Sequence, residues 1–405
     1  MSEPVLPERV VFVCATYLPR VTGVAMAMHA WARQLLSRGV RVSIVAPEYP
    51  PLDYYPLPSY PEGLEVVRLP SRPAPLASGI HTALARGRAW ERLVTDLRGQ
   101  RAIIHAQDLV VAGPLALTLG RRCALPVLLH AHYPIGEGDL TEWLPVQLGR
   151  PGRRAINATL RRLVERKARA VSRRAALVAT VSPYMEHLLR RRGIAEPLVV
   201  PCAVDVPPQI PALDIRKRHA IPAESPVLLY AGRLDPDKGI SALIDMAALL
   251  RQQEPRLRLL LVGGGPYLPR YVARAEALRL QESVLFAGWV PHHDLWAYFA
   301  QADLFVIANP HEAQGLVAIE AQAAGLPIVA YRGGGITLAV ADGRTGVLTD
   351  PTPQALAAAA LSLVRQRERL QAMRAAAPEQ AAAFTSERVF PILLDAYQRA
   401  RASTP

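Results

Sequence analysis

Glu312 and Glu320 are the side chains whose type and placement first suggest chemistry in this sequence. They flank Gly315, where an apolar run at 303–308 is typical of a buried strand and residues 315–324, rich in Ala and Leu, favour a helix. A helix that begins directly after a strand points free backbone N–H groups toward the carboxyl end of the strand. The sequence therefore predicts an anion site beside two carboxylates.

Glu320 lies beyond the first turn of this expected helix, so the helix N-terminus is not its partner. A diol of a sugar or ribose fits the carboxylate, because two adjacent hydroxyls can donate to its two oxygens. The alternative is a surface helix whose glutamates face water, which is the commoner arrangement for an isolated pair. Gly325 is expected to cap the helix and Pro327 to stop it.

The surrounding pattern resembles the signature of the retaining glycosyltransferases of family 4, which have the GT-B fold. In that family two glutamates with this separation bracket a Gly-Leu pair, here Gly315 and Leu316, before an Ala-rich helix. The resemblance implies that Glu312 lies by the donor sugar and its anomeric carbon, and that Glu320 binds the ribose. It also implies that the helix N-terminus at Gly315 and Leu316 faces the donor diphosphate.

Arg233 and Lys238 form a second motif, in a glycine-containing turn after the expected strand at 227–230. An arginine fork and a lysine point charge suit a diphosphate, and a plain turn with an Asp-Lys pair is the alternative. In the family the matching positions hold the donor diphosphate, and the backbone near Val290 meets the nucleotide base. These charges do the work of a metal, so neither a metal nor a cofactor is expected.

The first half of the chain begins in strand, loop, helix, strand order, which predicts a parallel sheet. Gly23, in its first loop, is by itself a helix cap, whereas in the family this loop lies against the donor diphosphate and the acceptor. His130 and His132 end a later strand and, at i and i+2, are expected on the same face. Hydrogen-bonded loop residues are the alternative, but the resemblance places His132 at the active-site histidine of the family.

Composition describes a folded protein with room for two domains, at 405 residues and 51% hydrophobic content. No apolar run approaches the roughly 20 residues of a membrane span, and the N-terminus is unlike a signal peptide, so a cytoplasmic location is expected. Cys14, Cys123 and Cys202 lack metal-ligand spacing and are predicted to be small core residues in a reducing compartment.

The net charge of +13 is concentrated in the first half of the chain. Residues 1–205 carry 27 basic and 16 acidic residues, a balance of +11, against 20 and 18, or +2, for residues 206–405. The segment Arg150–Arg174 alone holds ten basic residues and one acid, with apolar residues at helical spacing. It is either an ordinary helix with its apolar stripe on the core or a surface that binds anionic lipid. Few aromatics accompany these charges, so no nucleic-acid partner is expected.

The resemblance predicts an α/β protein of GT-B fold, with two doubly wound Rossmann-like domains facing a central cleft. The domains are expected at 1–205, on the acceptor side, and at 226–385, which binds the nucleotide sugar. Prolines in 206–225 indicate a linker. A last helix within 386–405 crosses back to the first domain in the family.

The predicted function is retaining transfer of a hexose, with UDP-glucose as the first candidate donor, to a membrane lipid by same-face attack. Diacylglycerol is the expected acceptor, because Gln314 stands where many family members have Phe and resembles the subset that glycosylates diacylglycerol. His132 would lie at the reacting ends of donor and acceptor, on a protein peripheral to the inner face of the membrane. The alternatives are a soluble sugar acceptor, a basic nucleic-acid-binding protein and a non-catalytic protein that binds nucleotide sugar.

Overall fold

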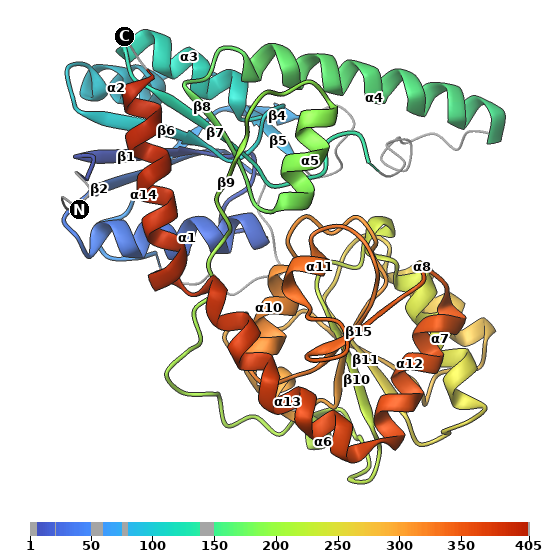
Figure 1. The fold of residues 1–405 in the computed structure, drawn as a ribbon. Helices are drawn as coiled ribbons and strands as arrows, with labels where there is room; N and C mark the ends of the chain where they lie inside the picture. Colours follow the sequence, from blue (N-terminus) through green and yellow to red (C-terminus); the bar gives the residue numbers. More distant parts are fainter. Residues whose placement is uncertain (1–5, 21, 50–59, 75–79, 138–149, 404–405) are drawn as a thin grey trace. The chain divides into compact units, whose positions relative to one another are not determined.

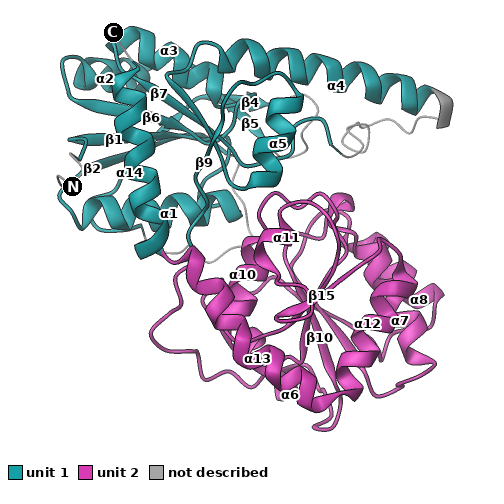
Figure 2. Cartoon of the chain, viewed as in Figure 1, with its two compact units in different colours: residues 1–203, 386–405 teal, residues 204–385 magenta. Residues whose placement is uncertain are grey.

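The structure is a computed structural model, which describes all residues except 1–5, 21, 50–59, 75–79, 138–149 and 404–405. The chain forms two compact units (Figure 2). The first consists of residues 1–203 together with 386–405, and the second of residues 204–385. Among the described helices, none is long and apolar enough to cross a membrane.

The first unit is built on a seven-stranded sheet in the order β3-β2-β1-β6-β7-β8-β9, in which every pair is parallel. Its strands are β1 (Arg9–Val13), β2 (Arg41–Pro47), β3 (Glu65–Leu69), β6 (Ala102–Ala106), β7 (Val127–Ala131), β8 (Leu177–Thr180) and β9 (Leu198–Val199). The central strands β1, β6 and β7 are buried throughout, as expected when helices cover both faces.

Helices and a small hairpin complete the first unit (Figure 1). They are α1 (Gly23–Leu36), α2 (Arg88–Leu97), α3 (Gly113–Cys123), α4 (Arg150–Ser172), α5 (Pro183–Arg191), α14 (Ser386–Ala402) and the antiparallel strands β4 (Ser71–Pro73) and β5 (His81–Ala83). Helix α14 packs against α1, β7 and β8. The last helix of the chain is therefore part of the first unit.

Residues 47–75, with their many prolines and tyrosines, are predicted from sequence to be a surface excursion, and for 65–69 that prediction is wrong. These residues form β3, which pairs in parallel with β2 from Ser43 to Pro47. The β-branched Val66 and Val67 favour a strand, but the prolines on either side obscure the short run. Residues 50–59 lie outside the described part of the chain.

The second unit has a six-stranded parallel sheet in the order β12-β11-β10-β13-β14-β15. Its strands are β10 (Val227–Ala231), β11 (Arg258–Val262), β12 (Val284–Gly288), β13 (Leu304–Ile307), β14 (Ile328–Tyr331) and β15 (Gly346–Thr349). Its helices are α6 (Ile215–Arg218), α7 (Ile240–Arg251), α8 (Leu268–Ala277), α9 (Leu295–Gln301), α10 (Leu316–Ala323), α11 (Ile336–Ala339), α12 (Pro353–Arg365) and α13 (Arg367–Ala381), with 3-10 turns at Pro236–Lys238 and Ala382–Phe384.

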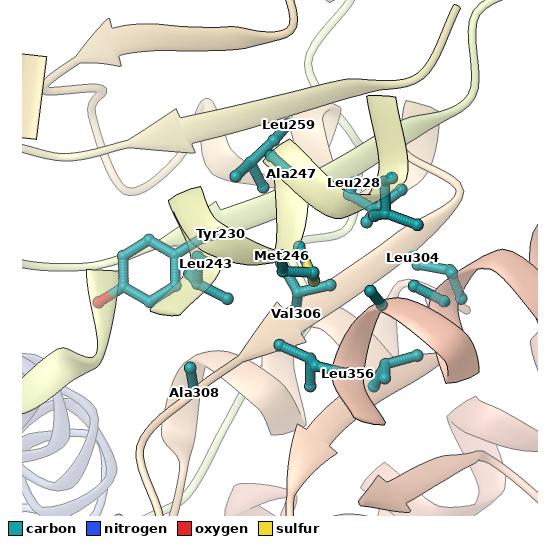
Figure 3. Close-up of a cluster of buried hydrophobic side chains, with 14 of the residues drawn as sticks. Leu228, Tyr230, Leu243, Met246, Ala247, Leu259, Leu304, Val306, Ala308 and Leu356 are labelled. Atoms are coloured by element: carbon teal, nitrogen blue, oxygen red, sulfur yellow. The ribbon is translucent and has the colours of Figure 1, made fainter. Parts of the chain in front are cut away.

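Alternate residues of each strand supply two apolar cores, one on each face of this sheet. Leu228, Leu259 and Val306 belong to the core against α7 and α12 (Figure 3). Their neighbours Leu229 and Leu260 belong to the core on the opposite face. This period of two is the expected result of burying both faces of a parallel sheet.

The predicted linker 206–225 is only partly a connector in the structure. Within it the short helix α6 buries Ile215 completely, and Ile221 is buried in the same apolar core of the second unit. Asp214 caps the helix by accepting from the backbone N–H of Lys217 at 3.0 Å. Residues 215–221 therefore fold as part of the second unit, because two isoleucines outweigh the proline signal.

Both sheets reverse their strand order at one point, between β1 and β6 in the first unit and between β10 and β13 in the second. Loops that leave neighbouring strands there run in opposite directions, which opens a crevice at the carboxyl edge of the sheet. In the second unit the loop after β10 carries the Arg233–Lys238 motif, and the loop after β13 carries Glu312. The topology alone thus brings two motifs, far apart in sequence, to the same place.

Candidate active site

Lys238 and Glu312 are in direct contact at the switch point of the second unit. Lys238 Nζ donates to Glu312 Oε2 at 3.0 Å, and Asn309 Nδ2 donates to the same oxygen at 2.7 Å. Asp237, the neighbour expected in a plain turn, lies farther away, with its Oδ2 3.8 Å from Nζ. The structure therefore joins the residue predicted to hold the diphosphate to the residue predicted to lie by the sugar.

The environment of this pair keeps both groups ionised. Burial acts to raise the pKa of Glu312, but the Lys238 charge and the hydrogen bonds from Lys238 and Asn309 outweigh it, and the pKa falls below its usual value. Burial acts to lower the pKa of Lys238, but the Glu312 charge outweighs that effect and the pKa rises. Each charge thus holds the other at the end of the sheet.

Gly239 is what lets these two loops approach each other. Its φ of +70° is in the left-handed region, and a Cβ at this position would lie 2.2 Å from the carbonyl oxygen of Ala308. A larger residue would push the loop after β10 away from the loop after β13. The contact between Lys238 and Glu312 depends on that close backbone approach.

Arg233 leads the same loop and forms an ion pair with Asp235 Oδ2. About half of the Arg233 side chain is exposed, while Asp235 is buried. Burial raises the pKa of Asp235, although the Arg233 charge opposes the rise. Tyr230 Oη donates to the Arg233 carbonyl oxygen at 2.9 Å and fixes the start of the turn.

Gly315 and Leu316 form the N-terminus of α10, as the sequence predicts. Gly315 is the N-cap, with φ of +80°, and no side chain caps the first turn. The Gly333–Gly335 loop packs closely on the backbone of Glu312, just before α10. Gly335 N donates to the Glu312 carbonyl oxygen at 2.5 Å. An uncapped helix N-terminus beside Lys238 and Arg233 is suited to an anion.

Glu320 is buried, with 8% of the residue exposed, so the surface-helix alternative is wrong for it. His292 Nε2 lies 2.8 Å from Glu320 Oε1. Sequence reasoning missed His292, and the only available signal was its position two residues after Val290 in the loop that follows β12. The Val290 side chain lies in the apolar core, which leaves its backbone as the part able to meet a ligand.

His132 lies in the first unit, directly after β7, in a group of buried polar side chains. Its Nε2 is 3.0 Å from Gln107 Oε1, an acceptor, so Nε2 carries the proton. Its Nδ1 is then the acceptor for the Cys202 thiol, with Sγ at 3.5 Å. The ring of His130 lies 4.3 Å away between centroids, which confirms that the two histidines share a face.

A stack of rings extends from His132 through the interior of the first unit. His130 Nδ1 is 3.2 Å from His105 Nε2, and His105 Nδ1 is 3.0 Å from the Tyr397 hydroxyl of α14. Trp31 stacks against His130. Burial lowers the pKa of His130 to about 3, and burial together with neighbouring histidines lowers the pKa of His105 and His132 well below the usual value. All three rings are neutral at pH 7.

Gly23 is the first residue of α1, and Thr22 is its N-cap. The Thr22 hydroxyl accepts from the backbone N–H of Ala25 at 3.1 Å. The helix start is therefore satisfied by a side chain, unlike that of α10. Gly23 and His132 belong to the first unit, while Glu312, Glu320, Arg233, Lys238, Gly315, Leu316 and Val290 belong to the second.

The basic segment forms the helix α4, which extends past the rest of the first unit (Figure 1). Ala168 and Val171, near its C-terminal end, are buried, whereas 58% of Leu163 is exposed and Ile156 is also exposed. Glu165 forms an ion pair with Arg192 of the same unit. The core-facing interpretation thus holds for the last turns of α4, and part of its apolar stripe remains uncovered.

Two parallel, doubly wound units with an anion site at a switch point define the GT-B class of glycosyltransferases. The family model for glycosyltransferase family 4 matches residues 21–207, and that for group 1 glycosyl transferases matches residues 212–380. The chain belongs to glycosyltransferase family 4.

Similar proteins include a D-inositol 3-phosphate glycosyltransferase of Stackebrandtia nassauensis, 30% identical over 93% of this chain and 87% of its own. A GDP-mannose-dependent phosphatidylinositol monomannoside mannosyltransferase of Mycolicibacterium smegmatis is 30% identical over 82% of this chain and 83% of its own. Among solved structures, sucrose-phosphate synthase of Thermosynechococcus elongatus has a TM-score of 0.74 at 23% identity, covering 98% of this chain and 100% of its own. The structure of Anabaena HepE in complex with UDP-glucose has a TM-score of 0.72 at 19% identity, covering 97% of this chain and 99% of its own. These last two similarities show the fold.

Proposed function

We propose that this protein is a retaining glycosyltransferase that moves a hexose from a nucleotide diphosphate sugar to a lipid acceptor at a membrane surface. Glucose is the first candidate sugar, and UDP-glucose the first candidate donor. The observation that carries the donor half is the contact of Lys238 with Glu312 beside the uncapped N-terminus of α10. A lysine held by one carboxylate can exchange it for a diphosphate, which has more charge and more acceptor oxygens.

In this proposal the charges of the second unit stabilise the leaving diphosphate. Arg233 and Lys238 donate to its oxygens, and the first backbone N–H groups of α10 add the positive end of the helix dipole. No metal is required for that step. Glu312, released from Lys238, accepts from hydroxyls of the sugar, and Glu320, oriented by His292, accepts from the ribose diol.

Transfer would take place on one face of the sugar, with retention of configuration. The acceptor oxygen bonds to the anomeric carbon as the bond from that carbon to the diphosphate breaks, and the hydroxyl proton passes to a diphosphate oxygen. His132 is neutral, with Nε2–H directed to Gln107, and would position the reacting groups without taking a charge.

The acceptor half of the proposal is supported by α4. Exposed Leu163 and Ile156 among arginines suit an interface helix, whose apolar side chains enter the headgroup boundary while the cations meet anionic lipid. In this proposal the protein acts at the inner face of the membrane. Gln314 favours diacylglycerol as the acceptor through the resemblance, and the mannosyltransferase relative is named for a lipid acceptor.

Release of nucleotide from UDP-, GDP- and ADP-sugars, with and without diacylglycerol in anionic vesicles, tests both halves. We expect one donor to be used, and its turnover to rise at least tenfold with lipid. Leu163→Glu should reduce vesicle binding several-fold, because a side chain proposed to enter the apolar part of the membrane becomes a negative charge that anionic lipid repels. Leu278→Glu is the matched control, since Leu278 is also exposed, at 41%, but belongs to the second unit. Equal effects of the two variants would contradict the role of α4.

A soluble acceptor is the second candidate. It is favoured by the relative named D-inositol 3-phosphate glycosyltransferase, which is similar over nearly the whole chain. Nucleotide release that is the same with and without vesicles, and that rises when soluble sugars or sugar phosphates are added, would select this candidate. No release with any donor, despite nucleotide-sugar binding, would instead indicate a non-catalytic binding protein.

A further inference from the structure

Two arginines of the first unit contact the same aromatic ring. The Cζ atoms of Arg20 and Arg68 lie 5.2 and 6.0 Å from the centroid of the Tyr49 ring. Neither forms an ion pair with a carboxylate in the described part of the chain. Both side chains are half-buried. Two cations at one ring, with no carboxylate among the described residues paired to either, form a site that an anion can occupy.

The hydrogen bonds of these residues leave donors unused. Arg68 is fixed by donating to the carbonyl oxygens of Leu18 and, at 3.1 Å, Pro47. Arg20 Nε is buried and has no partner among the described residues, and the same holds for the Tyr17 hydroxyl. A buried donor without an acceptor is costly, so the site is incomplete as it stands.

The position of the pair is at the ligand edge of the sheet. Arg20 follows β1, Tyr49 follows β2, and Arg68 is near the end of β3; these three strands are adjacent and parallel. Their carboxyl ends therefore lie on the same edge, which is also the edge that His132 follows on β7. His81 of β5 packs edge-on against Tyr49, with ring centroids 5.5 Å apart, and adds a neutral donor beside the cations.

We infer that Arg20 and Arg68 form a phosphate subsite of the first unit. Two guanidinium groups suit a phosphate better than they suit a single carboxylate, because a phosphate has more acceptor oxygens and more negative charge. The inference rests on the proposed function, because it assigns the first unit to the acceptor. The phosphate belongs either to a phospholipid headgroup beside a lipid acceptor or to a soluble phosphorylated acceptor.

Binding titrations without any nucleotide sugar test this subsite. One arm uses glucose 6-phosphate and inorganic phosphate, and the other uses vesicles of phosphatidylglycerol in phosphatidylcholine. Arg20→Gln is compared with Arg72→Gln, which removes the same charge from an exposed residue of β4. Arg68→Lys is a second variant that keeps the charge and removes the fork, and thermal unfolding checks that each variant folds.

We expect Arg20→Gln to weaken binding about tenfold in one arm, the loss of a charge-assisted hydrogen bond, and Arg72→Gln to weaken it less than twofold. A loss with the soluble phosphates identifies a phosphorylated acceptor, and a loss confined to vesicles identifies a lipid headgroup. Equal losses for the two variants in both arms, or no binding of the unaltered protein in either arm, overturns the inference. Phosphate binding without sugar transfer would keep the subsite and refute the proposed function.

Discussion

The two units place different electrostatics on the same frame. In the second unit the switch-point groups are ionised, with Lys238 paired to Glu312 and Arg233 paired to Asp235. In the first unit the histidines beside the corresponding edge are buried and neutral. The doubly wound sheet therefore decides where a ligand site lies, and the loop residues decide its charge. The ionised groups of the second unit suit a diphosphate, and the neutral histidines of the first unit suit the hydroxyl of an acceptor.

The comparison is tested most strongly at Lys238. Lys238→Met removes the cation that contacts Glu312 and leaves this partly buried carboxylate without its ion-pair partner. We expect kcat/KM for sugar transfer to fall about 10²- to 10³-fold, the usual loss for a group that stabilises developing charge. Steady-state kinetics with the preferred donor measures the change.

Asp237→Asn is the control for Lys238→Met. The Asp237 carboxylate is exposed and lies farther from Lys238 Nζ than Glu312 does, at 3.8 Å. A loss of less than threefold is expected, since exposed ion pairs contribute little. If Asp237→Asn were as damaging as Lys238→Met, general charge in the turn would explain the effect, and the contact with Glu312 would not.

Because the histidines of the first unit are buried and neutral, we expect the first unit to lose stability at a higher pH than the second unit as the pH is lowered. Their folded-state pKa values are lowered, so the unfolded chain binds more protons, and stability falls as the pH drops below the ordinary histidine pKa of about 6.5. The three side chains, His105, His130 and His132, can together contribute a slope of about 4 kcal/mol per pH unit. Hydrogen exchange at pH 7 and pH 5, followed in each unit, measures it.

His130→Gln should reduce that slope by about one third, whatever its effect on stability at pH 7. His187→Gln is the control, because His187 is an exposed residue of α5 outside the ring stack. An unchanged slope in His130→Gln would show that other groups cause the acid sensitivity.

The smallest expected effect is at Glu320. Glu320→Gln keeps the shape of the side chain but weakens its acceptance from a ribose diol and from His292. We expect KM for the donor to rise about tenfold with little change in kcat, because the ribose contact is the same in ground and transition states. A fall in kcat with unchanged KM would place Glu320 at the reaction centre instead.

Much of the second unit was predictable from local signals. The helix α10, its cap at Gly315 and its end at Gly325, with φ of +77°, follow from residue types that determine backbone conformation nearby. The resemblance to family 4 and the GT-B fold are confirmed by the family models and the solved structures. The buried positions of Cys14, Cys123 and Cys202 were also predicted correctly.

What sequence reasoning missed depends on contacts between distant residues. The hydrogen bond of His292 with Glu320 and the pairing of Lys238 with Glu312 each join separate loops, so no local period reveals them. Strand β3 and residues 215–221 were missed because flanking prolines hid short apolar runs whose burial is decided by the rest of the sheet and core.

The return of α14 to the first unit has a consequence for synthesis. Residues 204–385 form the second unit as one continuous stretch, so this unit can fold while the chain is still being made. The first unit also needs α14, which is made after the second unit: its Tyr397 contacts His105, and the helix packs against β7 and β8. The first unit, which begins before the second unit, is thus completed after it, and a chain that stops before Ser386 exposes the apolar surface that α14 covers.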